Sequence, residues 1–170
     1  TSGTYLRIDG ALNAQGNSTN KITFTSDSST SAASWQYIKF TDISDDNNCV
    51  ISYVEIKYAD YAIFCENASP AITNSLISYN NFGIYGSVGG SPKISNNTIS
   101  NNLYGIAGCD NSIIKNNTIT NNDRGIDGCN VKCTIEYNTI SYNIAGIYSE
   151  KYSSFNNTAI RNNNILNNTS

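Results

Sequence analysis

An internal repeat constrains the fold of this chain more than any other feature. Isoleucine recurs in three rows, and successive members of a row are 20 to 25 residues apart. The first row is Ile51, Ile72, Ile94, Ile114, Ile135 and Ile160, the second is Ile56, Ile77, Ile99, Ile119, Ile140 and Ile165, and the third is Ile63, Ile84, Ile106, Ile126 and Ile147. Three rows that stay in register over five or six repeats indicate one structural unit repeated along the chain.

Each repeat contains three short runs centred on isoleucine, and asparagine and glycine separate the runs. Both residues tolerate a positive φ, so they mark turns. No run is long enough for a helix of about 10 residues, and the Leu-x-x-Leu-x-Leu frame of a leucine-rich repeat is absent. We therefore expect an all-β parallel solenoid with three short strands per coil, about 8 coils of ~21 residues and a rise of ~4.8 Å per coil. The isoleucine rows should stack along its interior.

Asparagine also recurs in register with the isoleucines. Asn97, Asn117, Asn138 and Asn163 each lie three residues after an isoleucine of the first row. We expect these four side chains to form a ladder, in which each amide bonds to the asparagines of neighbouring coils. Further ladder positions follow the second row, with Asn80, Asn102, Asn122, Asn143 and Asn168.

The phrases "ITNSLISYNNFGIYG", "ISNNTISNNLYGIAG" and "IEYNTISYNIAGIYS" resemble the right-handed parallel β-helix repeat family. The opening "RIDGALNAQGNSTNKITFTS" is similar to the first coils of extracellular members, in which an Ile-x-Phe strand such as Ile22 and Phe24 follows a glycine-containing turn. The resemblance implies a right-handed β-helix. It does not imply one activity, because the family includes polysaccharide lyases, surface adhesins and structural proteins. Residues 1–12 show no amphipathic helical pattern, so we expect no capping helix. We expect one domain over residues 1–170, with irregular first coils over 1–48 and regular Asn-rich repeats over 49–170.

Composition narrows the classes of function. Charged residues make up 14% of the 170 residues, the formal net charge is −3, and there is no histidine and no methionine. The chain therefore lacks the commonest general base and a basic surface for nucleic acid. It also lacks a run of ~18 apolar residues that could span a membrane. We expect no enzyme activity, no catalytic or metal-binding residues and no cofactor.

Five cysteines in so polar a chain favour an oxidising compartment. Cys109 and Cys129 occupy the same position in successive repeats, and stacked strand residues lie within the Cα range of a disulfide. The number of cysteines is odd, and five with one unpaired allow 15 pairings, so alternatives stay open. Our order of preference is Cys49–Cys65, then Cys109–Cys129, which leaves Cys133.

Three other chemistries deserve a structural test. Asp123, Arg124 and Asp127, with Asp110 nearby, form the best cluster for carbohydrate cleavage. Residues 45–48, with sequence Asp-Asp-Asn-Asn, offer oxygen ligands for calcium. Two rows of hydroxyls, formed by Thr98, Ser100, Thr118, Thr120, Thr139 and Ser141, resemble the ice-binding arrays of β-helical antifreeze proteins.

Asn-x-Ser/Thr sequons are frequent in the chain. The candidate glycosylation sites are Asn17, Asn96, Asn116, Asn156 and Asn167. They would be used only if the source organism glycosylates secreted proteins.

The two ends of the repeat suggest assembly. Residues 5–8, which are Tyr5, Leu6, Arg7 and Ile8, have the pattern of a strand, whereas Ile160 and Ile165 open a last coil that lacks a Gly-Ile run. Uncovered strand edges recruit another chain, so we expect head-to-tail stacking of copies. Together with a resemblance to archaeal surface and sheath proteins, this favours a secreted, structural cell-surface protein that assembles into a fibre, sheath or layer. The partner is another copy, with surface polysaccharide as a further possibility; the alternatives are a carbohydrate-binding or carbohydrate-cleaving module and an ice-binding protein.

Overall fold

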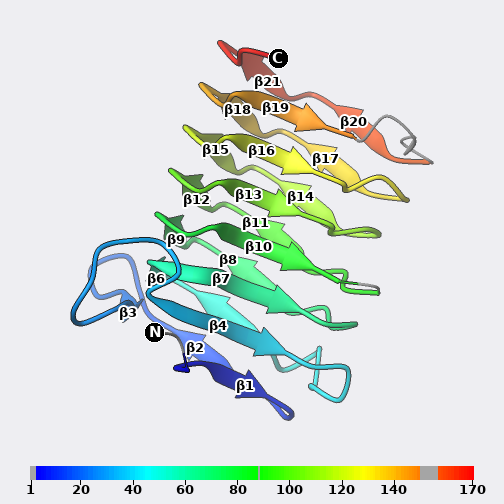
Figure 1. Cartoon of the computed structure of the whole chain (residues 1–170). Helices are drawn as coiled ribbons and strands as arrows, with labels where there is room; N and C mark the ends of the chain where they lie inside the picture. The colour runs from blue at the N-terminus through cyan, green and yellow to red at the C-terminus, as the bar shows by residue number, and fades with distance from the viewer. Residues whose placement is uncertain (1–2, 88, 150–156) are drawn as a thin grey trace.

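Three parallel sheets of seven strands each wind around one core in the computed structural model, which describes residues 3–87, 89–149 and 157–170 (Figure 1). The first sheet contains β1 (Leu6–Ile8), β4 (Trp35–Phe40), β7 (Ala59–Cys65), β10 (Phe82–Gly86), β13 (Tyr104–Ala107), β16 (Arg124–Asp127) and β19 (Ala145–Tyr148). The second contains β2 (Asn13–Gln15), β5 (Val50–Ser52), β8 (Ala71–Thr73), β11 (Lys93–Ser95), β14 (Ile113–Lys115), β17 (Thr134–Glu136) and β20 (Ala159–Arg161). The third contains β3 (Ile22–Phe24), β6 (Val54–Lys57), β9 (Leu76–Ser78), β12 (Thr98–Ser100), β15 (Thr118–Thr120), β18 (Thr139–Ser141) and β21 (Asn164–Leu166).

The chain visits the three sheets in turn, so each coil supplies one strand to each sheet. This is the expected all-β parallel solenoid with three strands per coil, and the described residues contain no helix. The number of coils differs slightly from the expectation, with seven strands per sheet in place of about eight coils. The difference arises because loops between β3 and β4, and between β4 and β5, lengthen the first coils beyond one repeat. In Figure 1 the first of these loops leaves the stack and runs along its side.

The three isoleucine rows form continuous columns inside the solenoid, as expected. Ile99 pairs in register with Ile77 and Ile119, and Ile119 pairs with Ile140. The side chains of Ile99, Ile119 and Ile140 are fully buried. Most strands of the second and third sheets are only three residues long, and in the regular coils the middle isoleucine points inward while its neighbours point outward. The period-2 alternation of a strand therefore gives each coil one core residue per short strand.

Turn residues with positive φ end the short strands at fixed places. After the second sheet they include Asn96, Asn116 and Tyr137, and after the third sheet they include Asn101, Asn121 and Tyr142, all with φ between 55° and 59°. Asparagine adopts this conformation more readily than most residues. The recurrence of this one dihedral explains why the repeat length varies so little within the regular coils.

Glycine precedes the first-sheet isoleucine because neighbouring coils approach closely there. A Cβ atom on Gly105 would lie 2.5 Å from the carbonyl oxygen of Gly125 in the next coil. No side chain fits in that space, so the Gly-Ile pattern reflects packing between coils.

None of the residues that the structure describes forms a helix long and apolar enough to cross a membrane.

Candidate functional site

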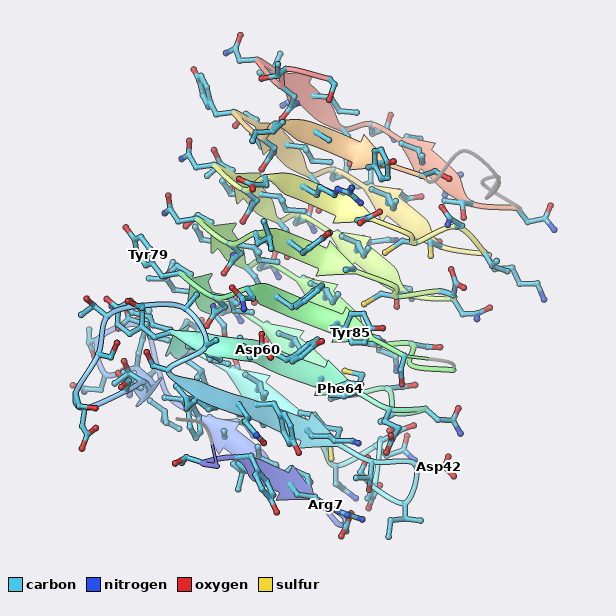
Figure 2. All side chains as sticks on the ribbon, viewed as in Figure 1. Arg7, Asp42, Asp60, Phe64, Tyr79 and Tyr85 are labelled. Carbon is cyan, nitrogen blue, oxygen red and sulfur yellow. The ribbon has the colours of Figure 1, made fainter. Side chains whose placement is uncertain are left out.

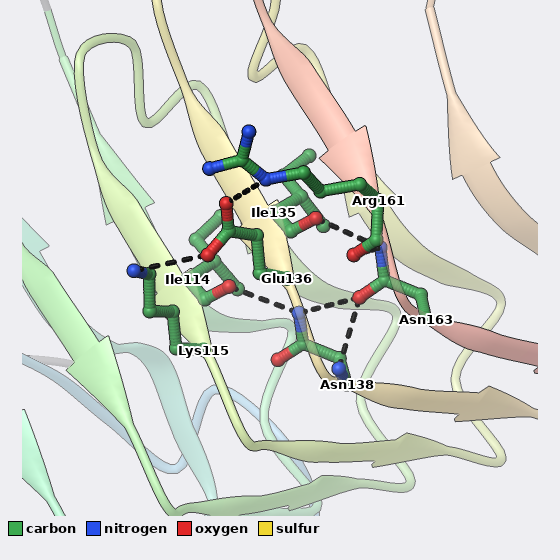
Figure 3. A network of polar contacts seen from close by, with 7 residues as sticks. All are labelled: Ile114, Lys115, Ile135, Glu136, Asn138, Arg161 and Asn163. Atoms are coloured by element: carbon green, nitrogen blue, oxygen red, sulfur yellow. Dashed lines mark hydrogen bonds and ion pairs between the residues drawn. The ribbon is translucent and has the colours of Figure 1, made fainter.

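Two buried asparagine ladders run along the solenoid, one at each tight turn. Asn97, Asn117, Asn138 and Asn163 form the ladder between the second and third sheets. The Asn117 amide donates to Asn138 Oδ1 at 3.0 Å and to the carbonyl oxygen of Ile94 at 3.0 Å. The Asn117 backbone N–H also donates to Asn138 Oδ1, at 2.9 Å. Figure 3 shows the same pattern one coil on, between Asn138 and Asn163.

The second ladder lies between the third and first sheets. Its members are Asn80, Asn102, Asn122, Asn143 and Asn168. Here the Asn122 amide donates to Asn143 Oδ1 at 3.0 Å and to the carbonyl oxygen of Ile99 at 3.1 Å. The ladders satisfy backbone groups that leave the sheets at the turns, which is why so polar a side chain can be buried.

The end face of the last coil exposes residues that are core residues elsewhere. Ile160 and Ile165 continue two isoleucine columns, through their pairing with Ile135 and Ile140. Ile135 and Ile140 are fully buried, whereas Ile160 is 39% and Ile165 is 49% exposed. Among the described residues, β20 and β21 each pair with one neighbouring strand. The C-terminal residues cover part of the outer edge of β19, because the Gly146 N–H donates to Ser170 O at 3.0 Å and the Ser170 N–H donates to Ile144 O at 2.8 Å. This end therefore presents apolar side chains together with the outer edges of β20 and β21.

The opposite end is formed by β1, β2 and β3, which are likewise the terminal strands of their sheets. Tyr5 and Leu6 are exposed, whereas Ile8 is buried and pairs with Phe40. Arg7 forms an ion pair with Asp9 at 2.8 Å. Of the four residues expected to form this end, three are therefore accessible and Ile8 belongs to the core.

A buried carboxylate ties the last coil to the two before it. Glu136 accepts hydrogen bonds from Lys115 Nζ at 3.0 Å and from Arg161 Nε (Figure 3). The Lys115 contact, with further support from Arg161, lowers the pKa of Glu136 below its ordinary value, although burial opposes this shift. The three residues lie side by side on β14, β17 and β20.

A stack of aromatic rings covers part of the outer face of the first sheet. Tyr61, Phe82 and Tyr104 lie on successive strands, with ring centroids 4.6 Å apart and interplanar angles of 5°. Phe64 and Tyr85, which are labelled in Figure 2, pack against the rings of Tyr61 and Phe82, with centroids 5.5 and 5.4 Å apart. Because the three stacked rings cover one another's faces, they present mainly edges to the outside. The stack extends the repeat spacing to the outer face, because these aromatic residues recur at intervals of 21 and 22 residues.

A shallow groove of about 370 Å³ runs beside the second ladder. It is lined by the loop before β4 and by turns of successive coils, namely Thr30, Ala32, Tyr79, Asn80, Asn81, Asn101, Asn102, Leu103, Asn121 and Asp123. Tyr79 is 50% and Leu103 is 44% exposed, so amide, carboxylate and apolar groups are accessible together. In Figure 2 Tyr79 projects from the turn edge of the solenoid. The repeat pattern did not predict the groove because Thr30 and Ala32, which close one side of it, belong to a loop outside the repeat.

The residues of the candidate catalytic cluster do not form one site, because each takes part in a different contact. Arg124 pairs with Asp127 at 2.8 Å and lies 4.1 Å from the centre of the Tyr148 ring. Asp110 accepts the backbone N–H groups of Asn130 and Val131, both at 2.9 Å, and so holds a turn. Of the acidic side chains in this cluster, Asp123 alone lines the groove.

The carboxylates of residues 45–48, the candidate calcium ligands, accept hydrogen bonds from the protein itself. The Asp45 carboxylate accepts the Asn47 N–H at 3.2 Å and the Asn48 amide at 2.7 Å. Asp46 accepts the Ser69 N–H at 2.7 Å. These oxygens therefore have partners within the protein, and within the described ranges no group of three Cys, Asp or Glu has the arrangement of a metal site.

Only one of the two expected hydroxyl rows is open to solvent. Thr98 and Thr118 are exposed on the third sheet, but Ser100 and Ser141 are buried and Thr120 is half-buried. The expectation of two exposed rows is corrected here. The second row lies next to the turn residues and the buried ladder, which cover it.

The sequon asparagines differ in their surroundings. Asn17, Asn96, Asn116 and Asn167 are exposed, and all but Asn17 occupy a positive-φ turn position. Asn17 Oδ1 accepts the N–H of Asn20 at 2.8 Å. Asn156 lies outside the described residues.

All five cysteines are buried free thiols in this structure, which differs from the expected disulfides Cys49–Cys65 and Cys109–Cys129. Backbone carbonyl groups hold several thiols: Cys49 Sγ donates to Gly10 O at 3.6 Å, and Cys109 Sγ to Ala107 O at 3.3 Å. Burial raises the pKa of the Cys65 thiol well above its ordinary value. A protonated thiol is a poor nucleophile, so we expect the Cys65 thiol to react slowly in the folded state.

Comparison with known proteins supports the fold and adds no activity. No curated protein and no solved structure matches the chain significantly. A family model described as a right handed beta helix region matches residues 12–169. With nearly its whole length matched and a three-sheet parallel solenoid as its fold, this chain belongs to the right-handed β-helix family.

Proposed function

We propose that this protein is a structural β-helix that assembles end to end, with the last coil of one copy stacked on the first coil of the next. The observation that carries the proposal is the exposure of Ile160 and Ile165, whose column neighbours are fully buried. Covering an isoleucine side chain completely contributes roughly 1.5–3 kcal/mol. A further coil placed on this face would bury both.

Backbone pairing supports the same arrangement. The edge strands β20 and β21 run parallel to all other strands of their sheets, as do β1, β2 and β3 at the other end. If a second copy lies in the same orientation, its first strands β2 and β3 can therefore continue the hydrogen bonding of β20 and β21 in parallel sheets. Such a contact is heterologous, so it produces a ring if the rotation closes and a filament if it does not.

The setting is part of the proposal. Low charge, an asparagine-rich surface and four exposed sequon asparagines suit a secreted protein of a cell surface, sheath or surface layer. The partner in this proposal is the protein itself, and no catalytic step is assigned to it.

Particle size and shape test the assembly. We expect concentration-dependent oligomers by light scattering and filaments or rings by electron microscopy. Ile165→Lys should abolish them, because it places a charge in the joint. Leu166→Lys is the matched control: Leu166 lies on the same strand and is 53% exposed, but it continues the outward column of Ser141. Monomers of the unaltered chain at high concentration, or equal effects of the two substitutions, would contradict the proposal.

A second candidate function is the binding of a neutral polysaccharide in the groove. Exposed amides, the Asp123 carboxylate and the apolar surfaces of Tyr79 and Leu103 together suit sugar hydroxyls and ring C–H groups. Calorimetry with cellohexaose and chitohexaose tests this idea. Binding that is lost in Tyr79→Asn and kept in Tyr142→Asn would favour it, since Tyr142 occupies the same turn position three coils further on. If neither sugar gives a heat of binding, this second candidate function is excluded.

A further inference from the structure

Three of the buried thiols meet at one turn of the solenoid. Cys109 follows β13, Cys129 follows β16 at the equivalent position of the next coil, and Cys133 precedes β17. The strands β13 and β16 pair in register up to Ala107 and Asp127, each two residues before its cysteine. Equivalent positions of neighbouring parallel strands are ~4.8 Å apart, which lies within the Cα range of disulfides.

The Cys129 side chain occupies the centre of this group. The pKa of the Cys129 thiol is raised, chiefly by the Cys109 side chain, while the Cys133 side chain acts in the opposite direction, so both thiols lie near Cys129. Cys133 Sγ also donates to the carbonyl oxygen of Cys109 at 3.1 Å. Cys133 is thus joined to Cys109 through a backbone oxygen, whereas the strand register places the Cys129 side chain beside that of Cys109.

The turn that carries the group is held in place independently of the sulfurs. Asp110 Oδ1 accepts the N–H groups of Asn130 and Val131, and the Asn111 N–H donates to Val131 O at 2.8 Å. The Cys133 N–H donates to the Thr158 hydroxyl at 3.2 Å. These contacts fix the backbone on both sides of Cys129, so the choice of sulfur partner is set by the fold.

We propose that Cys109, Cys129 and Cys133 form an oxidisable three-thiol site in which Cys129 is the shared partner. Oxidation makes one disulfide, either Cys109–Cys129 between coils or Cys129–Cys133 within one coil, and leaves the third cysteine as a thiol. With oxidised glutathione as the oxidant, two S–H bonds break and one S–S bond forms in the protein. The two protons and two electrons pass to the glutathione disulfide, which becomes two glutathione thiols.

The sequence permits a clean experiment, because trypsin cleaves after Lys93, Lys115, Arg124, Lys132 and Lys151. Cys109 then lies in peptide 94–115, Cys129 in peptide 125–132 and Cys133 in peptide 133–151. The full chain is refolded from urea in a buffer of reduced and oxidised glutathione, alkylated and digested, and its linked peptides are identified by mass spectrometry. We expect peptide 125–132 to be linked to 94–115 or to 133–151, and no link between 94–115 and 133–151.

Serine variants sharpen the result. Cys109→Ser should leave only the Cys129–Cys133 link, Cys133→Ser only the Cys109–Cys129 link, and Cys129→Ser neither. A Cys109–Cys133 link in the unaltered chain, or three alkylated thiols at these positions after oxidative refolding, would overturn the proposal. The peptide map of the unaltered chain decides the matter even if a variant fails to fold.

Discussion

The five coils from β7 to β21 and the two coils before them form the same solenoid, but they satisfy their turns in different ways. In the later coils the turn asparagines bond to their equivalents in the next coil, as Asn117 does to Asn138. The second coil begins this pattern, because the Val54 and Ala59 N–H groups donate to the Ser75 and Asn80 side chains of the next coil. In the first coil a polar side chain closes its own turn. Asn17 Oδ1 accepts the N–H groups of Thr19 and Asn20, at 3.1 and 2.8 Å.

The difference shows what a ladder requires. A stacked asparagine needs a neighbouring coil with its turn in the same place, so it is available only where the repeat length stays constant. A local turn cap needs no neighbour and tolerates loops such as the one before β4. Regular coils therefore gain buried, cooperative hydrogen bonding, while the first coils keep freedom to carry loops and the groove beside them.

The largest effect should come from the core of the regular coils. Ile119→Ala removes a fully buried side chain, and we expect it to cost about 2–5 kcal/mol through lost transfer energy and a cavity. Ile22→Ala in the first coil, where the side chain is only half-buried, should cost clearly less. Urea unfolding of both variants measures the difference. Equal losses would mean that the first coil is as tightly packed as the repeats.

The ladder itself gives the next test. Asn117→Ala leaves the Asn97 N–H and the Ile94 carbonyl group without their partners. Each unsatisfied buried group costs roughly 1–3 kcal/mol. Asn17→Ala removes an exposed cap and should cost about 1 kcal/mol or less. Thermal unfolding of the two variants compares a ladder turn with a local turn, and a larger loss for Asn17→Ala would reverse our interpretation.

A fall in pH should destabilise the last coil, which contains β20 and β21, before it destabilises the other regular coils. The folded-state pKa of Glu136 is lowered, so its contribution to stability is fully present above the unfolded value of about 4.3. That contribution is lost as the pH falls through the folded pKa. We expect Glu136→Gln to weaken the pH dependence of stability in this acidic range. Hydrogen exchange of β20 and β21 against pH checks it, and an unchanged profile in the variant would show that other carboxylates control the acid response.

The smallest expected effect is an increase in the stability of the folded chain. Tyr142 adopts φ 56° at a turn where Asn101 and Asn121 adopt the same conformation in other coils. Tyr142→Asn should stabilise the chain by up to about 1 kcal/mol, because asparagine tolerates this region better. A small rise in Tm would support the equivalence of the turns. A fall in Tm would show that the tyrosine ring contributes packing that the conformational argument omits.

The stacking of residues in the regular coils could be predicted because the same spacing recurs in every repeat. A spacing that recurs at Ile99, Ile119 and Ile140 specifies which residues stack, regardless of how the rest of the chain is arranged. The candidate sites fared differently. Ser100 matches its repeat, yet its burial depends on neighbouring turn residues, and Ile8 matches an exposed end strand but packs in the core.

The sequence by itself determined the three-strand coil, the inward isoleucine columns and the asparagine ladders, because each follows from a local pattern that only neighbouring repeats must share. The tertiary structure alone decided the number of coils, the groove beside Tyr79 and the contact of Cys133 with Cys109. These features depend on segments without a repeat, whose path is set by packing against residues far away in the chain. Periodic spacing carries no information about such paths, and contacts between the loops and the stack supply it.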